Sequence, residues 1–454
     1  MKIYRSLFFT LFLSFCFTMV YSQKIQWLKQ AGGSAEDRGF GIAVSDSGNI
    51  FVTGYFKGDG FFGTTKLKNS VHEDVFIAKY DKNGKFKWAN QAGSLSTDDD
   101  GQGVAVDKNE NCYVIGFFEG KAVFDSKEVS SNGKTDIFVA KYNSNGIIEW
   151  VINIGGKGND LGRSISLDGK GNCYITGKFE GTANFGDKSL TSSGGEDIFI
   201  CKINSENGKI LWANSGGSKG NDDCFSISTD YNGNSYIAGG IEKDAKFDNI
   251  TMKGSGSQDI FLAKYNTNGK LEWIKSAEGE STENARSVVV EPSGKYVYIT
   301  GVFSSETVSF DENIKLKSAG VFDMFIAKYD SNGILQWAKS EGGPDHDGGL
   351  AITVDKSGNS YVTGYFKSTA RIGDKEYTSN GDLDVFIAKF NPNGSVEWVI
   401  CGGGSMRERA DGIGIDKEGN IYFAGSFEDT FTFDNVQIKS KGSKDIFIGK
   451  CLNK

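Results

Sequence analysis

The sequence contains little proline and little histidine, and it has no long apolar run after position 22. Among its 454 residues there are only 3 Pro and 2 His. The scarcity of proline and of linker-like tracts argues against several small domains. His72 and His346 are too few for a zinc triad, and no G-x-S-x-G nucleophile motif occurs. The sequence therefore gives little support for an enzyme and predicts no organic cofactor.

A strong charge of one sign is also missing. The formal net charge is −8, so the chain has no electrostatic reason to bind nucleic acid or an anionic membrane surface. No segment beyond residue 22 is apolar over the roughly 20 residues that a membrane helix needs. We therefore predict neither a nucleic-acid partner nor a membrane span.

Residues 1–22 have the pattern of a secretory signal peptide. A short basic start precedes an apolar run, and "VYS" stands before Gln23. A lipoprotein cleavage box ending at Cys16 is the alternative, and the bulky Phe15 argues against it. We expect cleavage after Ser22 and an exported protein, located in the periplasm, at the cell surface or outside the cell.

The remaining cysteines allow two interpretations. Disulfides form in exported proteins, and Cys173 and Cys201 fall on adjacent predicted strands of one repeat, where they would be able to pair. Buried free thiols are the simpler alternative, because unpaired cysteine is among the most buried residue types.

Seven tryptophans recur at a nearly fixed distance of 61, 62, 62, 61, 64 and 61 residues. They are Trp27, Trp88, Trp150, Trp212, Trp273, Trp337 and Trp398. Such a long period marks a repeat architecture. Within a period, Asp-led turns such as "DKNEN" and Asn-Gly turns separate apolar runs, and Asn-Gly is a strong hairpin signal. Each period thus predicts strands A and B, a variable stretch, and strands C and D.

The predicted strand C is apolar on both faces. In "DVFIAKY" at 74–80, alternate residues point to opposite sides, and both sets are apolar. A sheet with one wet face would alternate, so neighbouring sheets must cover each four-stranded sheet on both sides. Seven such sheets around an axis form a β-propeller. We predict an all-β, seven-bladed β-propeller over residues 23–454, with repeats of about 61 residues.

The two chain ends complete this pattern. After the signal peptide, the chain opens with a strand D, "KIQWLKQ" at 24–30, and it closes with a strand C, "DIFIGKC" at 445–451. Pairing them would complete the seventh blade and close the ring. An open arc would leave a bare apolar strand at each end, which is an aggregation hazard.

The repeat resembles a known family. The pattern "TGYF…F…D-[IV]-F-I-A-K-Y-[DN]-x-N-G-x-x-x-W" is similar to the bacterial SBBP-type β-propeller repeat and covers nearly all of the mature chain. This resemblance implies a seven-bladed propeller, usually exported, without shared catalytic residues. "AKYDKNGKFKW" is also similar to the tryptophan-docking motif of quinoprotein propellers, but Tyr80 stands where that motif has its Asp. The second likeness supports a packing role for Trp and no quinone cofactor.

The most regular candidate site residues are seven acids, one before each predicted inner strand. They are Asp37, Asp99, Asp160, Asp222, Glu283, Asp347 and Glu408. They belong to the loop face, which carries the D–A loops and the B–C stretches, and loops on a rigid scaffold are where binding sites concentrate. One interpretation is an acidic collar at the channel mouth that attracts Ca²⁺, a basic partner or a cationic ligand. In the other, each acid binds backbone amides of its own loop.

Other repeated residues are expected to be structural. The Asp that opens strand C should hold the B–C stretch, the lysine of strand C should reach a neighbouring turn, and the Trp should pack between blades. Non-repeated aromatics such as Phe61 and Tyr377 are better candidates for stacking on sugars.

We therefore predict an exported, non-enzymatic binding scaffold for a protein or a glycan, acting through the loop face. A carbohydrate-active enzyme, either a hydrolase or a lyase that uses loop-face carboxylates, is the first alternative. A purely structural component of the envelope is the second. The fold alone does not choose among them.

Overall fold

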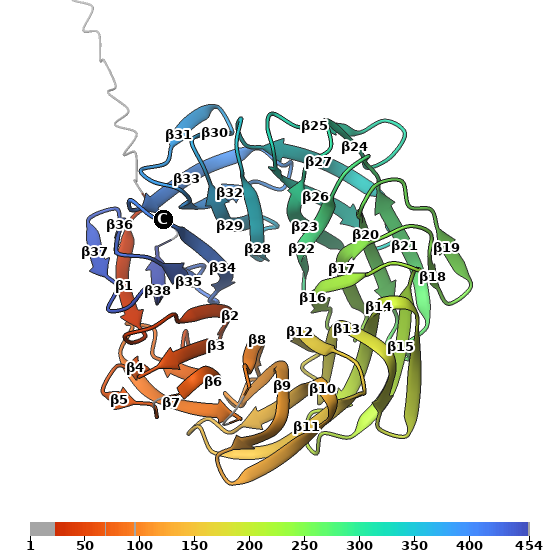
Figure 1. Cartoon of the computed structure of the whole chain (residues 1–454). Helices are drawn as coiled ribbons and strands as arrows, with labels where there is room; N and C mark the ends of the chain where they lie inside the picture. Colours follow the sequence, from red (N-terminus) through yellow and green to blue (C-terminus); the bar gives the residue numbers. More distant parts are fainter. Residues whose placement is uncertain (1–22, 69, 95–96, 453–454) are drawn as a thin grey trace, which may run out of the picture.

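The computed structural model describes residues 23–68, 70–94 and 97–452, so the predicted signal peptide at 1–22 lies outside the described residues. Within these ranges the chain is all-β, as predicted, and its strands are arranged around a central axis (Figure 1). No helix of the described chain is long and apolar enough to cross a membrane.

The strands of the described residues combine into seven four-stranded antiparallel units, numbered 1 to 7 by their inner strands. In Figure 1 the inner strands surround the axis and the outer strands form the rim. The inner strands are β2 (Arg38–Val44), β8 (Asp100–Val106), β12 (Asp160–Leu167), β16 (Asp223–Thr229), β22 (Glu283–Val290), β28 (Gly348–Val354) and β34 (Glu408–Ile415). The second strands are β3 (Ile50–Gly58), β9 (Cys112–Phe124), β13 (Asn172–Phe185), β17 (Ser235–Ile241), β23 (Tyr296–Phe303), β29 (Ser360–Phe366) and β35 (Ile421–Phe427).

The remaining two positions of each unit follow the predicted C and D strands. The third strands are β6 (Ser70–Tyr80), β10 (Lys127–Tyr142), β14 (Lys188–Asn204), β20 (Asp259–Tyr265), β26 (Asp323–Asp330), β32 (Asp384–Phe390) and β38 (Asp445–Cys451). The outer strands are β7 (Phe86–Gly93), β11 (Ile148–Gly156), β15 (Ile210–Gly217), β21 (Leu271–Ala277), β27 (Leu335–Glu341), β33 (Val396–Gly403) and β1 (Ile25–Ala31).

The first strand of the chain is therefore the outer strand of the last unit. β1 pairs with β38 from Ile25 opposite Cys451 to Ala31 opposite Ile446. This is the pairing that the sequence predicts for the two chain ends, and its physical reason is the apolar face that each strand would otherwise expose.

Both faces of each unit pack against a neighbour. On β6, Val75 and Ile77 belong to a core shared with unit 2, whereas Phe76 and Ala78 belong to a core shared with unit 7. All four side chains are fully buried. The two apolar faces predicted for strand C are therefore both used.

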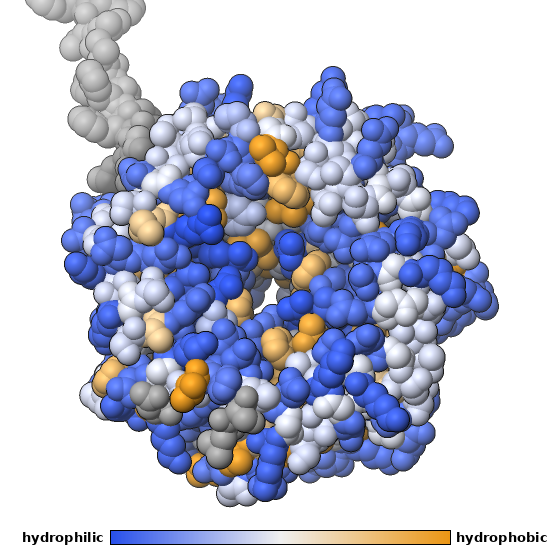
Figure 2. Space-filling view, in the orientation of Figure 1, coloured by the Kyte–Doolittle hydropathy of each residue, from blue (hydrophilic) through white to orange (hydrophobic). Residues whose placement is uncertain are grey.

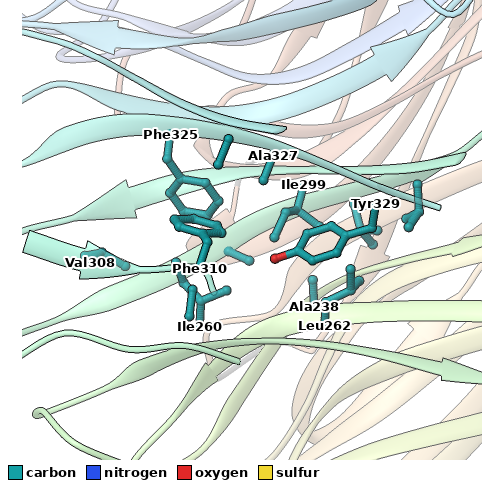
Figure 3. Packing of buried hydrophobic residues seen from close by; sticks show 14 of the residues in the cluster. Ala238, Ile260, Leu262, Ile299, Val308, Phe310, Phe325, Ala327 and Tyr329 are labelled. Carbon is teal, nitrogen blue, oxygen red and sulfur yellow. The ribbon is translucent and has the colours of Figure 1, made fainter. Parts of the chain in front are cut away.

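Figure 3 shows one of these layers in detail. Tyr329 of β26 lies beside Leu262 of β20, and Phe310 lies between Phe325 of β26 and Ile260 of β20, so that units 4 and 5 share a single core. Side chains from neighbouring units fill the space between sheets, and this packing fixes the position of every inner strand.

The stretch between the second and third strands, expected to be variable, folds as a hairpin. Separate hairpins are β4 (Phe61–Phe62) with β5 (Thr65–Lys66), β18 (Ala245–Phe247) with β19 (Ile250–Met252), β24 (Thr307–Ser309) with β25 (Lys315–Lys317), β30 (Thr369–Ile372) with β31 (Lys375–Thr378), and β36 (Thr430–Phe433) with β37 (Val436–Lys439). In units 2 and 3 the hairpin extends the long strands themselves. Its first strand pairs with the outer strand of the preceding unit, as Phe124 does with Ala92.

The cysteines form no bond with one another within the described residues. Cys173 and Cys201 are both fully buried free thiols. On the paired strands β13 and β14, Cys201 lies opposite Ile175, and Cys173 lies opposite Ile203. The disulfide interpretation is therefore wrong, because the register offsets the two cysteines by two positions along the ladder.

Candidate functional site

The seven acids predicted to form a collar, hereafter the collar acids, lie inside the loops. Each is at most 2% exposed: Asp37, Asp99, Asp160, Asp222, Glu283, Asp347 and Glu408. The carboxylate of Asp37 accepts hydrogen bonds from the amides of Gly33 at 2.7 Å and Lys57 at 3.1 Å. Backbone amides thus occupy the Asp37 carboxylate, as the second interpretation expects, and ligand binding at the collar acids stays a prediction.

Asp347 shows how a collar acid joins three segments of the chain. The carboxylate of Asp347 accepts from the amide of Gly343 in its own loop at 2.6 Å and from that of Lys367, just after β29, at 3.2 Å. The amide of Asp347 donates to the carbonyl of Phe322 in the preceding unit at 2.8 Å. Asp347 thus holds its D–A loop against its own unit and the one before it, and Asp37, Asp99 and Asp222 do the same in their units.

Burial raises the pKa of Asp347 to about 7. The amides of Gly343 and Lys367 oppose this rise, and the nearby carboxylate of Asp323 adds to it. Burial likewise raises the pKa of Asp222 to about 6, of Glu408 to about 8, and to about 7 for Asp37, Asp99 and Asp160. No three His, Cys, Asp or Glu side chains of the described chain come together as a metal site, so calcium binding at the collar acids stays a prediction without a preformed ligand set.

The repeated tryptophan and lysine connect each unit to the next. The indole Nε1 of Trp88 and the ammonium of Lys79 both donate to the carbonyl of Ser144, in the C–D turn of unit 2, at 3.1 Å. The Trp88 ring lies so close to Gly146 that a Cβ there would stand 2.8 Å from it. These residues have the packing role that the sequence predicts.

The Asp that opens each third strand holds the adjoining hairpin. Asp136 accepts from the amide of Asn132 at 3.0 Å, and Asp197 accepts from the amide of Ser193 at 2.9 Å. This structural role was also predicted. The repeated side chains are thus engaged in contacts that hold the fold together.

The residues that differ between repeats lead to another site. In unit 3, Gly162 pairs with Gly177 and Ser164 with Thr176, so the residue between them, Arg163, is left unpaired as a β-bulge. The same register shift occurs in the other six units. A bulge re-aims its side chain. The seven bulge residues, hereafter the bulge ring, are Phe40, Gln102, Arg163, Phe225, Arg286, Leu350 and Asp411.

The bulge ring lines one cavity on the axis of the molecule. The cavity has a volume of about 220 Å³ and receives all seven bulge residues, each of them half-buried. Figure 2 shows the hollow at the middle of the ring. A glycine, serine or alanine follows every bulge residue and also lines the cavity. Because these residues are small, it is mainly the bulge side chains that reach into the cavity.

Charges in and beside the bulge ring are mostly paired. Arg163 approaches Asp223 at 3.4 Å and donates to Gln102 at 3.3 Å. Arg409, two residues before the bulge of unit 7, donates to Asp411 through Nε at 2.9 Å and Nη2 at 2.6 Å. Each of these arginines therefore has a carboxylate partner.

The other candidates do not converge. His72 and His346 lie in different units, and each pairs with an aspartate next to it, at 3.5 and 2.8 Å. Phe61 is 38% exposed on β4, whereas Tyr377 is partly buried against the core of unit 6. The structure therefore brings neither the two histidines nor the two aromatics together.

A sequence signal for the bulge ring was present and was missed. Each bulge residue stands three positions after a collar acid, and its type changes from repeat to repeat while a small residue follows. The bulge itself depends on the register of two paired strands, which the repeat pattern alone does not reveal.

The fold and the site together define an all-β, propeller-like repeat protein. The SBBP family, described as a beta-propeller repeat, matches residues 26–62, which run from β1 into β4. The resemblance to the SBBP-type repeat is thus confirmed in this segment.

The sequence relatives of this chain are distant. An uncharacterized WD repeat-containing protein of Acanthamoeba polyphaga mimivirus is 24% identical over 89% of this chain and 36% of its own length. The regulatory protein FlaEY of Caulobacter vibrioides is 27% identical over 23% of this chain and 12% of its own length. The chain thus spans about a third of the first relative and a smaller part of the second.

Solved structures with a similar course of the chain are also remote. BamB from Moraxella catarrhalis is 10% identical, with a TM-score of 0.36 over 94% of this chain and 100% of that one. A quinohemoprotein alcohol dehydrogenase from Comamonas testosteroni is 10% identical, with a TM-score of 0.40 over 94% and 76%.

Proposed function

We propose that this protein is an exported, seven-bladed β-propeller that binds a protein or a glycan through its loop face and catalyses no reaction. In this proposal the seven units are the blades, and the pairing of β1 with β38 closes the ring. The apolar core that joins Phe76 and Ala78 of unit 1 to Tyr422 and Ile446 of unit 7 supports closure. Export rests on the signal-like pattern of residues 1–22.

The observation that carries the proposal is the contrast between repeated and non-repeated positions. The repeated Asp residues hold their own hairpins, and the repeated Lys and Trp residues contact neighbouring units, so their repetition is explained by the fold. The bulge ring occupies equivalent positions that converge on one cavity, yet it contains Phe, Gln, Arg, Leu and Asp. Differing side chains on a rigid and regular frame are what a binding surface requires.

Arrays of glycans and of exported or envelope proteins test the proposal directly. A ligand found in this way should protect the backbone amides of the D–A loops and the hairpins from hydrogen exchange. The A–B turns, such as 107–111 and 355–359, serve as the internal control on the opposite face. Protection confined to those turns, or no binding on any array, would contradict the proposal.

The same preparation should leave polysaccharides intact. The collar acids were the expected catalytic carboxylates of the enzyme alternative, and each is buried among backbone amides. Turnover of a polysaccharide that Asp99→Asn or Asp347→Asn abolishes would replace the proposal with a carbohydrate-active enzyme.

A further inference from the structure

Arginine and aromatic side chains alternate along one side of the channel. From unit 3 to unit 7 they are Arg163, Phe225, Arg286, Tyr365 and Arg409. The guanidinium carbons of Arg163 and Arg286 lie 5.9 and 4.2 Å from the centre of the Phe225 ring. That of Arg409 lies 5.8 Å from the centre of the Tyr365 ring. Stacking of this kind restricts a guanidinium group to a defined position.

The arginine in the middle of this row differs from the two at its ends. Arg163 is close to Asp223, and Arg409 binds Asp411. Within the described chain, by contrast, no carboxylate approaches Arg286 to within ion-pair distance. Its Nε is buried without a hydrogen-bond partner, as is the Nε of Arg163. Arg286 is thus a stacked guanidinium group whose charge has no direct counter-ion.

The surroundings of Arg286 make this arrangement unfavourable without a ligand. Burial lowers the pKa of Arg286, and the nearby guanidinium groups of Arg409 and Arg163 lower it too, whereas the carboxylate of Asp223 acts in the opposite direction. A buried donor without an acceptor is destabilising. An anion placed against the half-buried guanidinium group would supply the counter-ion that this group lacks.

We propose that the cavity binds the carboxylate group of a small acid or of an acidic sugar unit, with Arg286 as its main contact. This inference rests on the proposed function and specifies the ligand of the same face. A planar carboxylate matches the fork of a guanidinium group and forms two parallel hydrogen bonds with it. The stacking of Arg286 on Phe225 holds that fork in place before the ligand arrives.

The volume and the charge of the cavity restrict which ligands it can bind. A volume of about 220 Å³ is below the roughly 300–1,000 Å³ of pockets for drug-sized ligands, so it admits one small unit. Asp411 lies in the same ring, and the chain as a whole carries a net charge of −8. Both features disfavour phosphate or a polyanion, and they leave a single carboxylate as the best match.

Calorimetry on the intact protein tests the proposal with galacturonate as the probe and galactose as its neutral counterpart. We expect galacturonate to bind, galactose not to bind, and the affinity to fall as salt concentration rises. Arg286→Gln should weaken galacturonate binding at least tenfold. Lys356→Gln, at an exposed lysine in the 355–359 turn on the opposite face, removes one positive charge away from the cavity and should leave the affinity unchanged.

A second variant guards against a folding defect. Arg286→Lys keeps the charge but loses the fork, so it should bind galacturonate with an intermediate affinity while melting like the wild type. Equal binding of galactose and galacturonate would overturn the proposal. So would equal affinities of the wild type and of Arg286→Gln.

Two further comparisons identify the source of the carboxylate and distinguish failure of the carboxylate site from failure of the proposed function. Tighter binding of a uronate-terminated oligosaccharide than of free galacturonate would assign the site to a glycan, whereas equal binding would assign it to a free acid. If Arg286→Gln retains full affinity for a partner found on the arrays and for galacturonate, the carboxylate site is refuted and the scaffold stands. If galacturonate binds but no array partner exists, the carboxylate site stands and the proposed scaffold fails.

Discussion

Replacement of one collar acid, Asp347→Asn, should change the pH dependence of stability in a specific direction. In the folded protein the pKa of Asp347 is about 7, against an ordinary value of 3.8. The folded state therefore holds this proton more tightly than the unfolded state does. The contribution of Asp347 to stability is largest below the unfolded value, and it falls as pH rises from about 4 to about 7.

The expected magnitude follows from the same difference. At 1.36 kcal/mol per pH unit, Asp347 loses up to about 4 kcal/mol of its contribution over this range. An asparagine does not titrate, but its amide nitrogen faces the amide of Gly343 or of Lys367, and the unpaired donor costs about 1–3 kcal/mol. By pH 5 the wild type has lost about 1.6 kcal/mol of this contribution, so Asp347→Asn should lie within about 1 kcal/mol of the wild type there. At pH 8 it should be more stable than the wild type by about 1–3 kcal/mol.

Urea unfolding followed by tryptophan fluorescence at pH 5, 6.5 and 8 measures this difference. Asp374→Asn, at an exposed aspartate in the hairpin turn of the same unit, is the matched control and should unfold like the wild type at each pH. A deficit of Asp347→Asn that grows from pH 5 to pH 8 would refute the reasoning, because the charged carboxylate would then be the stabilising form.

Three further outcomes are expected. In Gly146→Ala a positive φ of 80° is combined with a new Cβ at 2.8 Å from the Trp88 ring, whereas in Gly120→Ala a φ of 75° is combined with open space around the Cβ. Gly146→Ala should therefore destabilise the protein by about 1–3 kcal/mol more than Gly120→Ala. Equal losses of stability in urea unfolding would argue against the Trp contact. The six described cysteines should not react with a thiol reagent at pH 8 until the protein unfolds, because burial raises the pKa of Cys401 and Cys451 to about 12; fewer than six reactive thiols after unfolding would point to a disulfide. Mass spectrometry of the exported protein should find Gln23 at its N-terminus, and retention of residues 1–22 would contradict the signal peptide.

Features that repeat could be predicted from the sequence. The apolar alternation on both faces of the strand that contains Val75 and Phe76 required neighbours on each side, and the structure places a core on each. Each of the incomplete repeats at 24–30 and 445–451 lacked a neighbouring strand that the other supplies, and β1 pairs with β38. In both cases the exposed apolar surface leaves a single favourable solution.

Features that depend on the register between strands could not be predicted from the sequence. A carboxylate before a strand has the same sequence pattern whether it faces solvent or binds its own loop, and Asp37 does the latter. Arg163 and Arg286 became site residues only because a bulge in each ladder re-aims their side chains.

Closure of the ring is tested most directly by a cross-link between the two ends of the chain. Ile25 lies opposite the native Cys451 on β1 and β38, and both side chains are buried in one core. Residues directly opposite on antiparallel strands have Cα atoms about 4.5–5.5 Å apart, within the range of a disulfide. Under mild oxidation Ile25→Cys should form an intramolecular disulfide with Cys451, seen as a joined peptide by mass spectrometry. Free thiols at both positions, or a bond between two molecules, would contradict a closed ring.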